Sequence, residues 1–226
     1  MNSNGLGLHL VLTGAPGCGK GTQASLLKER IAVPHLSTGD MLRAEAQTES
    51  ELGREIKALI EGGSLVPDDV IVRMLEKRID QDDCKNGFIL DGFPRTLPQA
   101  EALDELFKRK NIKLDAVIEI QVPDEIIMER ILGRYACMKC GQGYHDRYLQ
   151  PKVYGVCDHC GGTEFCRRND DNRSTVYNRL VNYRDLTYPT IPYFKEKDLL
   201  FCVDGTGSIE AVAKKIDDLL AVVREK

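Results

Sequence analysis

The segment Gly14-Ala15-Pro16-Gly17-Cys18-Gly19-Lys20-Gly21-Thr22 follows a short apolar run at residues 8–12 and opens a helical pattern over residues 20–31. Its glycines let backbone N–H groups approach phosphate oxygens closely, and the N-terminus of the helix adds a partial positive charge. Lys20 can reach the outer phosphates of a bound nucleotide. The segment therefore predicts a phosphate-binding loop, called the phosphate loop below, between the first strand and the first helix of an α/β fold.

One position of the phosphate loop departs from the usual Walker pattern. Gly21 stands where Ser or Thr normally offers a hydroxyl to magnesium, and Thr22 comes one residue later. We therefore expect magnesium to be held by phosphates, water and a carboxylate from elsewhere in the chain.

Apolar runs and helical patterns alternate along most of the remaining sequence. Buried strands are expected at residues 88–90, 116–118 and 199–203, and helical patterns cover residues 68–80, 97–110, 124–134 and 208–224. This alternation predicts a parallel sheet with helices on both faces. A chain of 226 residues is long enough for one sizeable core plus small insertions.

Two segments interrupt the alternation. Residues 37–66 have a helical pattern that inserts no strand and ends at Gly62-Gly63. Residues 135–168 are rich in cysteine, glycine and polar residues and look too irregular to join the core. We expect both segments to leave the sheet, the second of them held by a metal ion.

The metal site is expected from two Cys-x2-Cys pairs that are 16 residues apart. Four thiolates at this spacing can close a tetrahedral shell. Two disulfides or four free thiols are the alternatives, and His145 and His159 are less favoured ligands nearby. The four expected ligands are Cys137, Cys140, Cys157 and Cys160.

The other four cysteines receive separate interpretations. Cys202 falls in an expected strand and is assigned to the core, whereas Cys84 and Cys166 are assigned to loops. Cys18 lies near a helix N-terminus, where the pKa of a thiol tends to fall. We therefore expect Cys18 to be the most reactive of these thiols.

The overall composition excludes several classes of partner. The chain has 31 basic and 35 acidic residues, a net charge of -4, so neither nucleic acid nor an anionic membrane is expected to bind. No apolar run approaches the ~20 residues that cross a bilayer. The N-terminus lacks the basic region of a secretory signal, so a cytoplasmic location with reduced cysteines is expected.

Two further motifs lie beyond the phosphate loop. In the first, His35-Leu36-Ser37-Thr38-Gly39-Asp40-Met41-Leu42-Arg43, Thr38 or Asp40 is expected to cap a helix that places Arg43 one turn in. The second, Asp91-Gly92-Phe93-Pro94-Arg95-Thr96, follows an expected strand. Because ligands bind beyond the carboxyl ends of strands in open α/β sheets, Asp91 should face the phosphate loop.

Four motifs resemble those of the adenylate kinase family, in the same order and over nearly the whole chain. They are the phosphate loop, the motif at residues 35–43, D-G-F-P-R-T-L-P-Q-A (residues 91–100) and R-N-D-D-N-R-S-T-V-Y-N-R-L (residues 168–180). The glycine at position 21, which departs from the usual Walker pattern, is also typical of the phosphate loop in that family. The resemblance implies a P-loop NTPase-type fold with a five-stranded parallel sheet, an AMP-binding arm and a small zinc-ribbon lid. The implied core comprises residues 1–36, 67–133 and 173–226, the arm residues 37–66, and the lid residues 134–172.

The resemblance also implies an activity, the reversible, magnesium-dependent reaction of ATP and AMP to two ADP, and a monomer whose arm and lid move. Arg130 and Arg134, expected four apart on one helix, would clamp ATP. The implied ATP contacts are Gly17, Cys18, Gly19, Lys20, Gly21, Thr22, Arg130 and Arg134. The implied AMP contacts are Thr38, Arg43, Leu65, Val66, Gly92, Arg95, Gln99, Arg168 and Arg179. The implied catalytic residues are Lys20, Asp91, Arg95, Arg130, Arg168 and Arg179.

The chemistry explains why so many cations are needed. Phosphoryl transfer requires in-line positioning and positive charge against the equatorial oxygens, and a phosphate acceptor needs no general base. A GTP:AMP phosphotransferase or a kinase for UMP or CMP is the alternative; the long lid and Gln99 favour AMP, whereas the donor base stays open. A zinc-ribbon nucleic-acid binder is disfavoured by the acidic balance.

Overall fold

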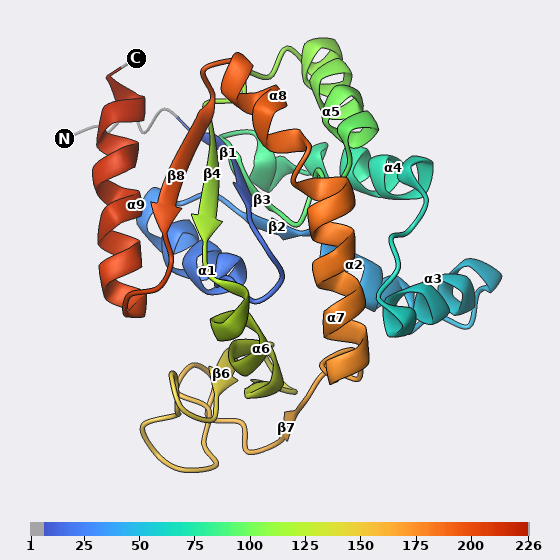
Figure 1. Cartoon of the computed structure of the whole chain (residues 1–226), viewed down its shortest axis with the longest axis vertical. Helices are drawn as coiled ribbons and strands as arrows, with labels where there is room; N and C mark the ends of the chain where they lie inside the picture. Colours follow the sequence, from blue (N-terminus) through green and yellow to red (C-terminus); the bar gives the residue numbers. More distant parts are fainter. Residues whose placement is uncertain (1–6, 226) are drawn as a thin grey trace.

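The computed structural model describes residues 7–225 and contains a five-stranded parallel sheet in the order β2-β3-β1-β4-β8 (Figure 1). This arrangement confirms the predicted fold class. The strands are β1 (His9–Thr13), β2 (His35–Ser37), β3 (Phe88–Asp91), β4 (Ala116–Gln121) and β8 (Leu200–Asp204).

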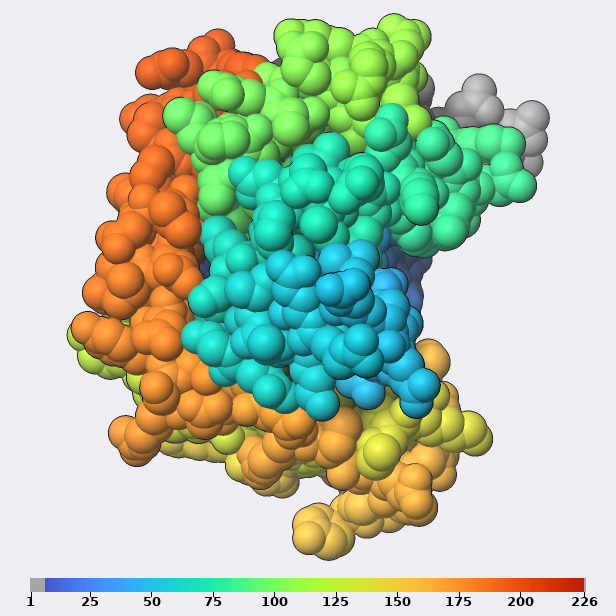
Figure 2. Space-filling model, turned by 90° about the vertical axis from the view of Figure 1, so that its right-hand side faces the viewer, coloured from blue at the N-terminus to red at the C-terminus, as the bar shows by residue number. Residues whose placement is uncertain are grey.

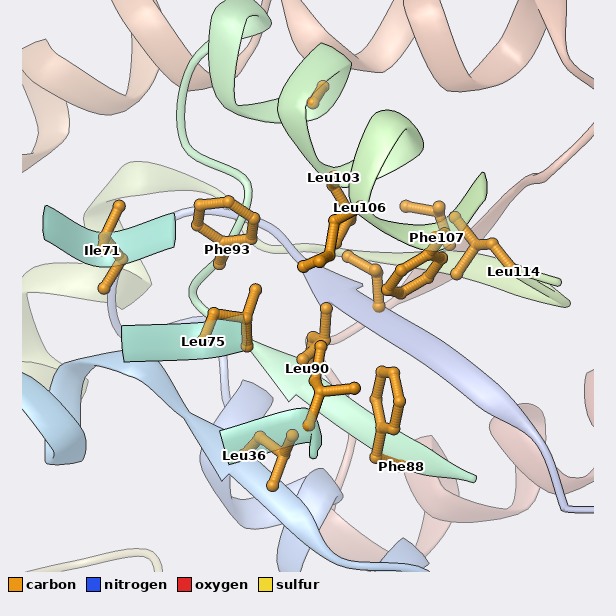
Figure 3. Packing of buried hydrophobic residues seen from close by; sticks show 14 of the residues in the cluster. Leu36, Ile71, Leu75, Phe88, Leu90, Phe93, Leu103, Leu106, Phe107 and Leu114 are labelled. Atoms are coloured by element: carbon orange, nitrogen blue, oxygen red, sulfur yellow. The ribbon is translucent and has the colours of Figure 1, made fainter. Parts of the chain in front are cut away.

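Helices cover both faces of this sheet (Figure 1). They are α1 (Lys20–Ile31) and α9 (Ile209–Arg224) on one face, and α4 (Asp68–Ile79), α5 (Leu97–Lys110) and α8 (Thr190–Glu196) on the other. In β1, Leu10 and Leu12 pack with α1 and α9, whereas Val11 between them packs with α4, α5 and α8. Alternate side chains of a strand point to opposite faces, so a continuous apolar run is what a sheet covered twice requires. Figure 3 shows the apolar cluster on the face covered by α4, α5 and α8, in which Leu90 of β3 faces Leu103 and Leu106 of α5.

The strand β2 is the fifth strand of the sheet, which the sequence analysis expected but did not locate; only its last residue, Ser37, falls within residues 37–66, for which no strand was expected. It has three residues and pairs with β3 through His35 and Ile89, Leu36 and Leu90, and Ser37 and Asp91. A strand this short leaves no alternating pattern, and its conformation depends on pairing with β3. It brings the following helices, α2 (Thr38–Glu45) and α3 (Glu51–Gly62), to the carboxyl edge of the sheet.

The start and end of the arm (residues 37–66) have clear local causes. Ser37, rather than Thr38 or Asp40, caps α2, because its hydroxyl accepts a hydrogen bond from the backbone N–H of Asp40 at 3.2 Å. Gly63 ends α3 with φ +75°, as expected from the Gly62-Gly63 pair. Figure 2 shows the arm beside the segment that contains α7 (Arg173–Asn182), and the Thr175 hydroxyl of α7 donates to the carbonyl of Glu61 at 3.0 Å.

The helix expected over residues 124–134 is shorter than predicted. The helix α6 (Asp124–Leu132) ends at Gly133, and Arg134 begins β5 (Arg134–Cys137). A Cβ at Gly133 would lie 2.4 Å from Nε2 of His145, so the His145 ring of the lid lies directly against this glycine at the end of α6. Arg130 and Arg134 therefore do not share one helical face, and that prediction is wrong.

The lid (residues 134–172) is more regular than its composition indicated. The strand β5 pairs in antiparallel fashion with β6 (Gly143–His145) and β7 (Phe165–Cys166), and Figure 1 places this sheet beyond the end of α6. Its aromatic rings Tyr135, Tyr144 and Phe165 pack with centroids 5.6–5.8 Å apart. This is a small apolar core, so much of the stability of the lid must come from elsewhere.

After the lid, α7 continues through a π-helical turn (Tyr183–Thr187) to α8, and a short 3-10 turn (Asp82–Cys84) precedes β3. Among residues 7–225, no helix has the length and apolar character that a membrane span needs.

Candidate active site

The phosphate loop lies at the carboxyl end of β1, where it leads into α1. Gly19 caps α1 with φ +104°, and no side chain of the described residues accepts from the first amides of this helix. The first turn also carries no acidic residue. These amides and the helix dipole are therefore available to an anion, as the sequence predicted.

Two glycines of the loop are fixed by close contacts. A Cβ at Gly14 would lie 2.5 Å from the carbonyl oxygen of Ile120, and one at Gly17 would lie 2.6 Å from Cγ1 of Ile131. The Nζ atom of Lys20 donates to the carbonyl oxygens of Gly14 at 2.7 Å and of Ala15 at 3.0 Å. The loop thus surrounds a single ammonium group at the N-terminus of α1, where phosphate oxygens would meet it.

Asp91 ends β3 and faces the phosphate loop, which agrees with the prediction. A Cβ at Gly21 would lie 3.5 Å from Oδ2 of Asp91, so the carboxylate stands beside the place where other Walker loops carry a hydroxyl. Burial by itself raises the pKa of Asp91, but the hydrogen bond with His35 and the charge of Lys20 outweigh it and lower the pKa. Asp91 is therefore an anion at neutral pH and suits a cation such as magnesium.

His35 is a site residue that the sequence analysis did not single out. Its Nε2 lies 3.1 Å from Oδ2 of Asp91. The contact exists because β2 pairs with β3. Since the sequence analysis did not locate β2, it could not predict that His35 lies beside Asp91.

A pocket lies between the arm, the end of β3 and α7, next to the phosphate loop. Its apolar lining includes Leu42, Ile60, Ile71 and Phe93, of which Figure 3 shows Ile71 and Phe93. The pocket combines all but Arg168 of the expected AMP residues: Thr38, Arg43, Leu65, Val66, Gly92, Arg95, Gln99 and Arg179. An apolar slot with a few polar groups at its edges has the chemistry of a nucleotide site.

Arg95 is held in this pocket by the turn that precedes it. Its Nε donates to the carbonyl oxygen of Gly92 at 2.7 Å, and burial lowers the pKa of its guanidinium. The Thr38 hydroxyl donates to the same carbonyl at 2.9 Å. Gly92 has φ +81°, and a Cβ there would crowd both Thr38 and Arg95, so glycine is required at this turn.

The remaining arginines approach the site from α6, the lid and α7. Arg130 Nη1 lies 3.4 Å from the carbonyl oxygen of Cys18 in the phosphate loop, and Arg168 Nη2 lies 3.4 Å from Oδ1 of Asp40, which also binds Arg43. Burial lowers the pKa of Arg179 to about 10, so this side chain also stays charged. The structure therefore brings the expected cations to one edge of the sheet.

Carboxylates that sequence reasoning did not assign hold two of these arginines. Asp170 accepts from Arg179 at 3.0 Å, and Asp171 binds Arg134 through both carboxylate oxygens. Asp170 is 5% exposed. The adjacent Asp170-Asp171 pair was visible in the sequence, but its partners depend on how the lid packs on α7. Even with these carboxylates, cations outnumber anions in the site: Lys20, Arg43, Arg95, Arg130, Arg134, Arg168 and Arg179 against Asp40, Asp91, Asp170 and Asp171.

The four lid cysteines form one cluster, with all Sγ atoms within 4.8 Å of one another. The Cys137–Cys160 and Cys140–Cys157 sulfur pairs are each 3.6 Å apart. A metal ion at ~2.3 Å from four tetrahedral sulfurs would place those sulfurs about 3.8 Å apart. The donor set therefore fits a tetrahedral metal ion, and His145 points instead to the end of α6.

Comparison with known proteins agrees with this geometry. The sequence profile of the family described as adenylate kinase matches residues 12–199. The chain belongs to the adenylate kinase family. An adenylate kinase from Allorhizobium ampelinum is 51% identical over 214 residues, 95% of this chain and 99% of the relative. Those of Acetivibrio thermocellus (48% identical) and Clostridium tetani (45%) each align over 96% of this chain and 100% of the relative. The family consists of nucleoside monophosphate kinases, so the pocket beside the phosphate loop belongs to a phosphotransferase.

The structure of this adenylate kinase family member changes the expectation for Cys18. Cys18, in the phosphate loop, is 2% exposed, whereas Cys166 and Cys202 are exposed. Because alkylation requires access as well as thiolate, we expect brief labelling to modify Cys166 and Cys202 before Cys18. Peptide mass spectrometry after a short pulse of iodoacetamide measures the order. Modification of Cys18 first would show that the loop opens on the timescale of the reaction.

Proposed function

We propose that this chain transfers the terminal phosphoryl group of ATP to AMP, reversibly and with magnesium, and so maintains the balance of adenine nucleotides. The observation that carries the proposal is the juxtaposition of two anion sites. The phosphate loop follows β1, and the pocket lined by Arg95 and Gln99 begins at the end of the neighbouring strand β3. Cationic side chains surround both sites.

The proposed roles follow from these positions. On the donor side, the amides of residues 17–22 and the Lys20 ammonium would bind the ATP phosphates, with Arg130 and Arg134 closing on them. On the acceptor side, Arg43 and Arg95 would bind the AMP phosphate through guanidinium forks. Leu65, Val66, Thr38, Gly92 and Gln99 would hold its adenosine.

Catalysis in this proposal is electrostatic. Arg168 and Arg179 lie between the lid, the arm and the pocket, where they would stabilise the charge of the transferring phosphoryl group. The acceptor oxygen belongs to a phosphate and is already anionic, so no side chain has to remove a proton from it. Asp91 would bind magnesium through water, and magnesium bound with ATP supplies neutralising charge to the phosphates.

The lid cluster would hold zinc in a structural role. Four thiolates complete a tetrahedral shell and leave no position for substrate or water. Zinc is proposed because closed tetrahedral sites of four thiolates are typical of structural zinc, which has no redox chemistry.

We also propose that the chain has three parts, a core (residues 1–36, 67–133 and 173–226), the arm (37–66) and the lid (134–172). Arm and lid would close over the nucleotides and keep water from the phosphoryl group. A monomer suits two such moving parts. A cytoplasmic location suits eight cysteines that are all free thiols in the described residues.

A panel of nucleotide pairs tests the proposed activity. Each of AMP, GMP, CMP and UMP is combined with ATP or GTP, and nucleoside diphosphates are separated and counted. We expect AMP with ATP to give the highest rate, and ATP without an acceptor to release almost no phosphate. A higher rate with GTP would identify a GTP:AMP phosphotransferase, and a preference for UMP or CMP would overturn the proposed acceptor.

A further inference from the structure

The side-chain amide of Gln99 is held at both ends. Its Oε1 accepts from the backbone N–H of Arg95 at 2.7 Å, and its Nε2 donates to Oδ1 of Asp68 at 2.6 Å. A backbone N–H can only donate and a carboxylate can only accept, so these two partners determine which end of the amide is oxygen. Gln99 is 3% exposed, which leaves it little room to rotate.

Each end of this amide keeps one unused hydrogen-bonding position. The oxygen has a second lone pair and the nitrogen a second N–H. Because Gln99 lines the pocket together with Leu65 and Val66, the unused pair is available to a planar ligand lying along these side chains. The pocket edge therefore offers one acceptor and one donor side by side, in a fixed order.

This order suits one class of purine. A 6-amino purine offers a donor at its exocyclic nitrogen and an acceptor at the neighbouring ring nitrogen, whereas a 6-oxo purine offers an acceptor and then a donor. To bind a 6-oxo purine in the same place, Gln99 would have to turn its amide by half a rotation. Its NH2 group would then meet the Arg95 N–H, and its oxygen would meet the Asp68 carboxylate.

We propose that Asp68 is a positioning residue for base selection, which keeps the Gln99 amide in the orientation that accepts AMP and rejects 6-oxo purine monophosphates. Asp68 begins α4 and is not among the residues that line the pocket, so it reaches a bound base through Gln99. The Thr96 hydroxyl, 3.4 Å from Oδ2, holds the other oxygen of the carboxylate. The proposal rests on the function proposed above, because it requires the acceptor base to lie in this pocket.

Selection of this kind works by penalising the wrong ligand. With Asp68 in place, a turned amide would leave two like pairs facing each other, donor against donor and oxygen against carboxylate. Without the carboxylate only the Arg95 N–H opposes the turned amide, because the amide oxygen no longer faces a negative charge. Removal of Asp68 should therefore weaken AMP binding and, at the same time, weaken the rejection of IMP.

The test compares Asp68→Ala with Asp69→Ala, using AMP and IMP as acceptors and ATP as donor. Asp69 is a matched control: it lies in the same first turn of α4, and within residues 7–225 its carboxylate pairs only with the exposed Arg73. Both variants lose one carboxylate near the helix N-terminus, so any general effect on α4 is shared. We expect the ratio of kcat/KM for AMP over IMP to fall about tenfold in Asp68→Ala, the effect of one lost hydrogen bond to a charged group.

The split between kinetic constants separates positioning from a structural role. The change in Asp68→Ala should lie in KM for AMP, with KM for ATP unaltered and Asp69→Ala like the wild type. Asp68→Asn keeps an acceptor oxygen but not its charge, so its AMP to IMP ratio should be intermediate, and this variant serves if Asp68→Ala does not fold.

An unchanged ratio in both Asp68 variants, with kcat/KM for AMP and IMP lowered equally, would overturn the inference while the proposed function stood. A wild-type protein that used AMP and IMP equally would overturn it as well. A wild-type protein inactive with AMP would instead contradict the proposed function itself.

Discussion

Lys20→Met is expected to lower kcat by about 10³-fold, the scale on which a preorganised charge stabilises a transition state. The Lys20 ammonium is the group that the loop carbonyls of Gly14 and Ala15 hold at the N-terminus of α1. Methionine keeps a flexible, unbranched side chain of similar length and a high helix propensity, so the fold should be retained. Initial rates with saturating ATP and AMP, together with a thermal melt, measure both expectations.

The matched control for this prediction is Lys28→Met. Lys28 lies in the last turn of the same helix and is exposed, away from the phosphate loop. We expect this variant to keep wild-type turnover. If Lys20→Met folded and turned over at a rate close to that of the wild type, the assigned role of the loop in binding the transferring phosphate would be wrong.

Removal of the lid metal is expected to have the largest effect on stability. Beyond its aromatic cluster the lid has little apolar core, and metal binding to four thiolates contributes folding free energy directly. With a strong chelator under reducing conditions we expect the melting temperature to fall by about 10 °C, since each lost kcal/mol costs roughly 2–4 °C in a chain of this size. Metal analysis before treatment should find one zinc ion per chain.

Activity should respond to metal removal only through the lid. In the cold, where the stripped lid stays folded, we expect substantial turnover to survive, because the cluster has no free coordination position. Cys157→Ser should reproduce the loss of stability, whereas Cys202→Ser, outside the cluster, should not. Loss of all activity at a temperature where circular dichroism shows a folded lid would give the metal a catalytic role and contradict the proposal.

Local sequence patterns correctly predicted the limits of several helices and the cysteine cluster. The helices over residues 20–31 and 97–110 have the predicted limits, because Gly19 and Thr96 provide their starts and the apolar spacing is regular. The cysteine pairs likewise predicted their cluster, since the distance between them in sequence fixes which knuckles can meet. Gly133 is a local stop signal as well, but the predicted helix over residues 124–134 runs past it, whereas α6 ends at Leu132.

The sequence did not predict the features that depend on contacts between distant segments of the chain. The strand β2 exists because it pairs with β3, and the contacts of His35 and Asp170 follow from such packing. The assignment of Cys202 to the core is wrong, and the sequence did not predict that Cys84 is buried. Cys202 lies in β8 as predicted but is exposed, because β8 is an edge strand, whereas Cys84 is buried, with its sulfur 3.0 Å from Nη1 of Arg78. No local pattern distinguishes these environments.

The most direct test of the central claim gives the protein a single nucleotide. With ADP and magnesium alone, a phosphoryl group must pass from one ADP in the pocket of Arg95 and Gln99 to a second ADP in the phosphate loop, which leaves AMP in the pocket and ATP in the loop. Separation of the nucleotides over time should show ATP and AMP appearing in equal amounts, with almost no inorganic phosphate, until an equilibrium is reached that added AMP reverses. Formation of AMP with free phosphate and no ATP, or no reaction of ADP at all, would contradict it.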